Sequence, residues 1–149
     1  MANTYLLIVV ALIAGAVIPT QTSLNNRMAT SLSSPILAAL VSFVVGTVSL
    51  LIYVIASGEK IADVSLARNA PAFAWLGGLL GAFFVASTII LLPRLGVVLT
   101  ISLVIAGQMI MSLIIDHFGL LGTPVKEINL ARVSGVILIG VGAVIIRKF

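Results

Sequence analysis

The sequence predicts an all-α membrane protein with five transmembrane helices. Of its 149 residues, 61% are hydrophobic and 8% are charged, and the mean hydropathy is +1.33. A soluble domain is about 25% charged, so this chain could not cover its surface with polar groups. Apolar stretches recur along it, each close to the roughly 20 residues that a helix needs to cross a bilayer. We expect one transmembrane domain over residues 1–149, with spans at about residues 5–26, 35–57, 71–92, 97–115 and 128–146.

The first span changes character along its length. It begins as hydrocarbon and then holds Pro19, Gln21 and Asn25. A proline inside a helix removes a backbone hydrogen bond, so we expect a kink near Pro19. Gln21 and Asn25 stand four residues apart and therefore share one helical face. Polar groups in lipid need protein or water partners, so we interpret this face as the wall of a pathway; hydrogen bonding from helix to helix is the alternative.

The second and third spans carry small residues at helical spacing. Pro35 and Pro71 suit the first turns of these spans, and the third is expected to stop at Pro93. A turn is expected over residues 26–34 and a loop over residues 58–69. Small residues let helices approach closely in a membrane. The two stripes are Ala39, Ser42, Gly46, Ser49 and Tyr53 in the second span, and Ala74, Gly77, Gly78, Gly81 and Thr88 in the third.

The fourth span carries a second polar face. Gln108, Ser112 and Asp116 step by four along it, so the polar face deepens from the Asp116 end. We predict that Gln108 and Ser112 line the pathway together with Gln21 and Asn25. Asp116 and His117 meet the membrane interface. We interpret these two neighbours as a solvated helix end; an acid/base pair is the alternative.

The fifth span is the shortest. Starting it at Ile128 gives it enough length and places Arg132 in the first turns, where its side chain can reach the interface. Small residues on two of its faces make it the first candidate for a seam between two copies of the chain, with the glycines of the third span as the rival. These residues are Gly135, Gly140, Gly142 and Ala143.

Lysines and arginines are balanced between the two sides of the predicted topology. One side holds Lys60, Arg68, Lys126 and Arg132, and the other holds Arg27, Arg94, Arg147 and Lys148. The positive-inside rule therefore gives no bias, and the chain can insert in both orientations. The alternative is that another feature, such as the N-terminal amine, fixes the orientation. The first residues carry no lysine or arginine, so we expect the first span to be retained rather than cleaved as a signal peptide after Ala14-Gly15-Ala16.

Composition argues against several classes of function. The chain has no cysteine and one histidine, so we expect no disulfide, no metal site and no cofactor. We find no phosphate-binding glycine loop and no nucleophile motif, and we expect no enzymatic activity. The net charge of +4 is better explained by lysine and arginine meeting lipid headgroups than by nucleic acid.

Several motifs in order along the chain carry a resemblance to a known family. They are Gly15-Ala16-x-x-Pro19-x-Gln21-x-x-x-Asn25, Ser34-Pro35, Ser42-Phe43-x-x-Gly46, Pro71-x-x-x-Trp75-x-Gly77-Gly78-x-x-Gly81, Pro93-x-Leu95-Gly96, Gly107-Gln108 and Asp116-x-x-Gly119. With these motifs the chain resembles the short, five-span group of the drug/metabolite transporter superfamily, bacterial proteins described as inner-membrane exporters. The resemblance implies a half-size transporter bundle in the bacterial inner membrane.

The resemblance also implies pairing and a transported small molecule. We expect an antiparallel homodimer with alternating access, surrounded by lipid; a non-transporting structural or accessory membrane protein is the alternative. Related four-span exporters carry a glutamate inside the first span, whereas this chain offers the amides of Gln21 and Asn25, which cannot titrate. If protons couple to transport, Asp116 or His117 is the candidate.

Overall fold

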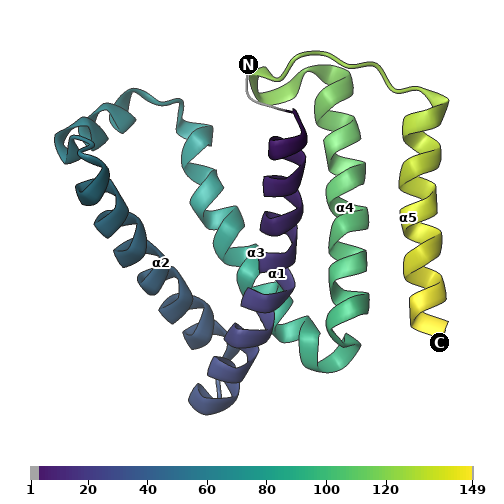
Figure 1. The fold of residues 1–149 in the computed structure, drawn as a ribbon, viewed down its shortest axis with the longest axis horizontal. Coiled ribbons are helices and arrows are strands. Elements are labelled where there is room, and N and C mark those ends of the chain that lie inside the picture. The colour runs from purple at the N-terminus through teal and green to yellow at the C-terminus, as the bar shows by residue number, and fades with distance from the viewer. Residues whose placement is uncertain (1–3, 149) are drawn as a thin grey trace. The chain divides into compact units, whose positions relative to one another are not determined.

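The computed structural model describes residues 4–148 as helices joined by short connections (Figure 1). In chain order they are α1 (Thr4–Leu32), α2 (Pro35–Ser57), η1 (Ile61–Asn69), η2 (Ala72–Trp75), α3 (Leu76–Leu95), α4 (Val97–Phe118), η3 (Leu120–Gly122) and α5 (Leu130–Lys148). Five helical stretches within residues 4–148 are long and apolar enough to cross a membrane. No strand occurs in this range, which confirms the all-α membrane class. The first three residues, which bear on the signal-peptide alternative, lie outside the described part.

The chain forms two compact units. The first runs to Pro93 and the second starts at Arg94, so the boundary falls in the last turn of α3.

Helix α1 extends further than the sequence predicts. A turn was expected from Asn26 onward, but α1 continues to Leu32. The hydroxyls of Thr30 and Ser31 donate to the carbonyls of Asn26 and Arg27 at 3.1 and 3.3 Å, so these two hydroxyls have their partners inside the helix.

The reversal between α1 and α2 is confined to two serines. Ser33 adopts a left-handed backbone with φ of 52°. The side chain of Ser34 accepts a hydrogen bond from the Leu37 amide at 3.3 Å and so caps α2, whose first residue is Pro35. A serine cap followed by proline at the first helical position is a strong helix start. The tight reversal places α1 and α2 against each other.

The core of the first unit is small and lies where α1, α2 and α3 meet. Ala29 of α1, Ala38 and Ala39 of α2 and Ile89 of α3 are buried together. Alanines allow close backbone approach, which is how membrane helices gain packing contacts without a hydrophobic driving force. From this core α2 and α3 diverge toward the end where η1 and η2 connect them (Figure 1). Most of the remaining small residues of both predicted stripes are therefore left exposed.

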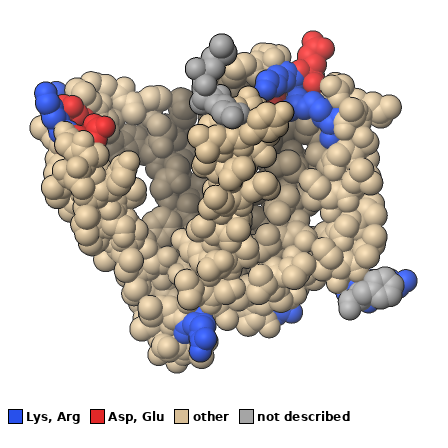
Figure 2. All heavy atoms as spheres, viewed as in Figure 1, with Lys and Arg blue, Asp and Glu red and all other residues tan. Residues whose placement is uncertain are grey.

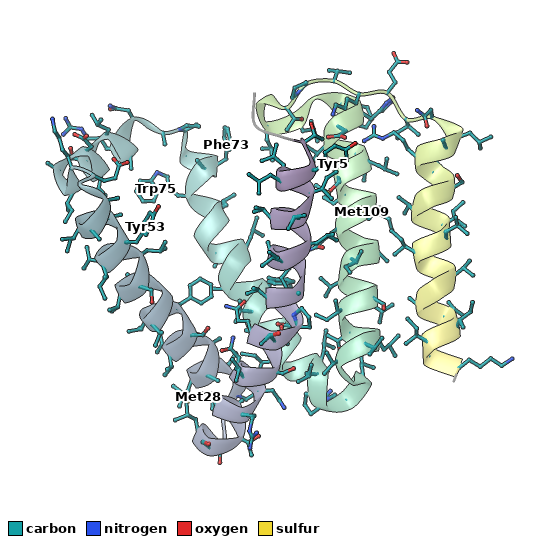
Figure 3. The ribbon with its side chains drawn as sticks, viewed as in Figure 1. Tyr5, Met28, Tyr53, Phe73, Trp75 and Met109 are labelled. Atoms are coloured by element: carbon teal, nitrogen blue, oxygen red, sulfur yellow. The ribbon has the colours of Figure 1, made fainter. Side chains whose placement is uncertain are left out.

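The α2–α3 connection carries aromatic residues. Figure 3 shows Tyr53 of α2 and Trp75 of η2 near this end of the unit, and both side chains are exposed. Tyrosine and tryptophan concentrate at membrane interfaces because their rings are apolar and their tips are polar.

At the other end of α3, Pro93 lies inside the helix, which continues to Leu95 instead of stopping at Leu92 as predicted.

The second unit is a helical hairpin. Helices α4 and α5 pack side by side and run antiparallel, with η3 and an extended segment between them (Figure 1). Thr100 is almost fully buried near the start of α4, and Ala143 is buried near the end of α5. The hydroxyl of Thr100 donates to the Gly96 carbonyl at 2.7 Å, so its burial leaves no polar atom unsatisfied.

Charged side chains lie at the helix ends of each unit, and Figure 2 shows uncharged surface between them. In the first unit they occur on the α2–α3 connection and at Arg27 in the last turns of α1. In the second they occur around the α4–α5 connection, at Arg94 and in the last turn of α5. This distribution matches a bilayer core that excludes charge and two interfaces that accept it.

Candidate functional site

A groove along α1 brings two of the predicted site residues together. It is an open groove of about 380 Å³, and all of its lining residues belong to α1: Ile13, Ala16, Val17, Thr20, Gln21, Leu24 and Asn25. Gln21 is exposed and Asn25 is half-buried. Thr22 and Ala29, which are the buried residues of α1, lie on a different face of the helix from Gln21. The groove therefore combines a mostly apolar wall with two amides.

The hydroxyl groups that neighbour Gln21 in α1 are hydrogen-bonded, whereas the side-chain amides of Gln21 and Asn25 have no such bond within the described residues. The hydroxyls of Thr20, Thr22 and Ser23 donate to carbonyls four residues earlier at 3.0, 2.9 and 2.8 Å. In contrast, the amide groups of Gln21 and Asn25 make no hydrogen bond with any other residue between 4 and 148. Their donors and acceptors remain available on a helix that is long and apolar enough to cross a membrane. Helix α1 is unbroken at Pro19, but its axis changes direction in the second half of the helix (Figure 1).

The other two predicted site residues lie on α4. Ser112 lines a cleft of about 280 Å³ between α4 and α5, together with Met109, Leu113, Arg132, Gly135, Val136 and Ile139. Gln108 lies outside this cleft and is exposed. Gln21 and Asn25 belong to the first compact unit, whereas Gln108 and Ser112 belong to the second. Gln21 and Asn25 thus line the same groove, whereas only Ser112 of the two α4 residues lines the cleft between α4 and α5.

Asp116 forms an ion pair with Arg132 across the hairpin. Both side chains are 30% exposed, so neighbouring residues shield the pair in part. The Arg132 guanidinium also donates to the carbonyl of Lys126 at 2.9 Å and to that of Glu127 at 3.5 Å. One arginine therefore joins the end of α4, the connecting segment and the start of α5.

Further bonds surround this ion pair. The Lys126 amide donates to the Asp116 carbonyl at 2.8 Å, and the Ile128 amide donates to Nδ1 of His117 at 3.3 Å. The side chain of Asn129 accepts from the Arg132 amide at 2.9 Å and caps α5. His117 therefore contributes an acceptor to the segment that connects α4 and α5.

The ion pair between Asp116 and Arg132 was not predicted from the sequence. Arg132 was expected only to extend toward the interface. The signal was present, because Asp116 ends one span and Arg132 begins the next, and a hairpin brings those two ends together. Between residues 4 and 148, no three histidine, cysteine or carboxylate residues are grouped closely enough to hold a metal ion.

Together, the five apolar helices and the charge confined to helix ends describe a small multi-pass membrane protein. A family model described as "Putative inner membrane exporter, YdcZ" matches residues 6–145. The chain belongs to this family, and it is accordingly a multi-pass protein of the inner membrane. No curated protein and no solved structure matches the chain.

Proposed function

We propose that this protein moves a small molecule across the inner membrane by alternating access, as an antiparallel homodimer. Its pathway is lined by Gln21 and Asn25 of α1 and by Gln108 and Ser112 of α4. The observation that carries the proposal is the groove on α1, whose two amides have no hydrogen-bond partner within residues 4–148. The family match to inner membrane exporters supports the transporter class.

The available amides support a pathway because of what they would cost in lipid. An amide without a hydrogen bond in an apolar medium costs on the order of several kcal/mol. The hydroxyls of α1 avoid this cost by bonding back to their own helix, which Gln21 and Asn25 do not do. Water or substrate in a pathway supplies the missing partners, and so do side chains of another helix in the scaffold alternative.

Two copies are proposed because one copy provides little enclosure. Five helices in two compact units leave most of their large apolar side chains exposed, and the hydrophobic cluster where α1, α2 and α3 meet groups only four of the buried residues that the structure describes. Transporters commonly place their site between inverted repeats that move against each other. This chain shows no convincing internal inverted repeat, so an inverted second copy supplies the other half. The balance of lysine and arginine between the two sides permits that arrangement.

Both α3 and α5 offer small residues for the seam between copies. In α5, Ala143 is buried and Gly135 lines the cleft against α4, whereas an added Cβ at Gly140 or Gly142 would meet no atom within 4 Å. In α3, Gly77 and Gly78 are exposed, and an added Cβ at either position would meet no atom within 4 Å. An open glycine surface allows a second helix to approach closely.

The proposal is tested by reconstituting the purified protein into liposomes and screening flux over a panel of metabolites. Thermal stabilisation by the same compounds provides a second readout. Concentration-dependent flux that saturates, with a matching stabilisation, is the expected result. A protein that folds and reconstitutes but neither transports nor is stabilised by any compound would favour the structural or accessory alternative.

A further inference from the structure

One residue, Gly96, separates α3 from α4. Helix α3 ends at Leu95 and α4 begins at Val97. The boundary between the two compact units falls only a few residues earlier, after Pro93. The covalent link from the first unit to the second therefore passes from one helix into the next through a single non-helical residue.

Gly96 has a backbone conformation that other residues do not adopt readily. Its φ is 77° and its ψ is 166°, in a region that is essentially restricted to glycine. A Cβ built on Gly96 would meet no atom within 4 Å, so neighbouring atoms do not exclude a side chain. The requirement for glycine here comes from the backbone dihedrals and not from close packing.

The segments on the two sides of Gly96 differ in how firmly they are held. The amide and the hydroxyl of Thr100 both donate to the Gly96 carbonyl, at 3.2 and 2.7 Å, and Thr100 is 1% exposed. These bonds fix the peptide plane that follows Gly96 to α4. On the other side, Pro93 has no N–H and removes one hydrogen bond from the last turn of α3. Rotation about φ and ψ of Gly96 can therefore redirect one helix against the other without breaking the bonds to Thr100.

We propose that Gly96 is the pivot about which the α4–α5 unit turns against the α1–α3 unit. Hinges are a few residues at element ends that absorb a large change in φ and ψ, and Gly96 meets that description. The ion pair and backbone bonds around Arg132 hold α4 and α5 together, so that they turn as one body. The role of this pivot in transport rests on the proposed function, whereas the motion itself does not.

The experiment measures the distance between the two units. The chain has no cysteine, so Leu50→Cys on α2 and Leu138→Cys on α5 give two unique spin-label sites at exposed positions. Distance distributions are recorded by pulsed electron paramagnetic resonance in lipid nanodiscs, with the labelled protein diluted into unlabelled protein. Gly96→Ala should shift or narrow the distribution, because alanine disfavours the dihedrals of Gly96. Val97→Gly should broaden it, because a second glycine adds backbone freedom.

Gly107→Ala is the matched control. Gly107 lies inside α4 and also has no atom within 4 Å of an added Cβ, but its backbone is helical. Its variant should reproduce the parent distribution. If Gly96→Ala fails to fold, the distance distribution of Val97→Gly alone tests the pivot. Parent-like distributions in every folded Gly96→Ala or Val97→Gly sample would overturn the pivot. Absence of flux in the unmodified protein would count against the proposed function and leave this distance measurement unaffected.

Discussion

Arg132 in the first turn of α5 forms an ion pair with Asp116 in the last turn of α4. The same guanidinium donates to two carbonyls of the connecting segment. Bonds from charged donors contribute more to stability than neutral ones, at about 1.5–3 kcal/mol each when well shielded. The Arg132 side chain therefore holds α4, α5 and their connecting segment together at one end of the α4–α5 hairpin.

Removing either member of the ion pair should destabilise the protein. We expect Arg132→Ala to lower the free energy of unfolding by about 1–2 kcal/mol, because partial exposure reduces the value of each bond. A double-mutant cycle with Asp116→Ala should give a coupling energy of about 1 kcal/mol, measured by denaturant unfolding in detergent. Lys126→Ala is the control, since the Lys126 side chain makes no ion pair within residues 4–148, and it should change stability by less than about 0.5 kcal/mol. Additive single effects would contradict the pairing.

The amide of Gln21 should be needed for transport and not for folding. Leucine at this position packs against lipid and apolar neighbours but offers a substrate no hydrogen bond. Loss of one such bond predicts a roughly tenfold to hundredfold reduction of flux for Gln21→Leu in liposomes. The unfolding temperature should stay the same or rise.

Ser49→Ala is a matched control for Gln21→Leu. Ser49 is also polar and exposed on a transmembrane helix, but its hydroxyl donates to the Val45 carbonyl at 2.8 Å. Its removal should leave flux close to that of the unmodified protein. Normal flux in both Gln21→Leu and Asn25→Leu would place the site elsewhere.

Transport should be facilitated or only weakly coupled to protons. Gln21 and Asn25 cannot titrate, and the groove that they line on α1 includes no charged residue. Asp116 is a candidate for coupling, but it already holds Arg132. Flux of the unmodified protein should therefore respond little to an imposed pH gradient, and Asp116→Asn should not change that response. A strong gradient dependence that disappears in Asp116→Asn would contradict this prediction.

The sequence predicted the helical class because hydropathy and span length are properties of short segments. It could not predict that α1 would continue past Asn26 to Leu32, because a run of polar residues at the end of a span fits a turn as well as a last helical turn. The polar face of Gln21 and Asn25 follows from helical spacing alone. The bond between Asp116 and Arg132 does not, because it depends on how two helices pack. Likewise, the small residues of α2 and α3 predicted contacts, but only packing could select Ala38, Ala39 and Ile89 as the core.

The balance of basic residues predicts that the chain is inserted in both orientations. Four lysines and arginines lie on each side of the five-helix topology: Lys60, Arg68, Lys126 and Arg132 on one side, and Arg27, Arg94, Arg147 and Lys148 on the other. The four acidic residues lie on the first of these sides, but acidic residues contribute little to orientation. An antiparallel pair requires both orientations, so orientation can be measured separately from transport.

A single cysteine placed next to Lys148 reports on orientation, because the chain has no other cysteine. In cells, we expect this cysteine to be labelled from both sides of the membrane, since neither orientation has an excess of basic residues. Two basic residues added at the C-terminus break the balance and should make labelling one-sided. As a control, one basic residue is added on each side of the membrane, which keeps the two counts equal. The cysteine next to Lys148 should then still be labelled from both sides of the membrane. Labelling from one side only, unchanged by the added basic residues, would mean that another feature fixes the orientation, and the antiparallel pair would then be excluded.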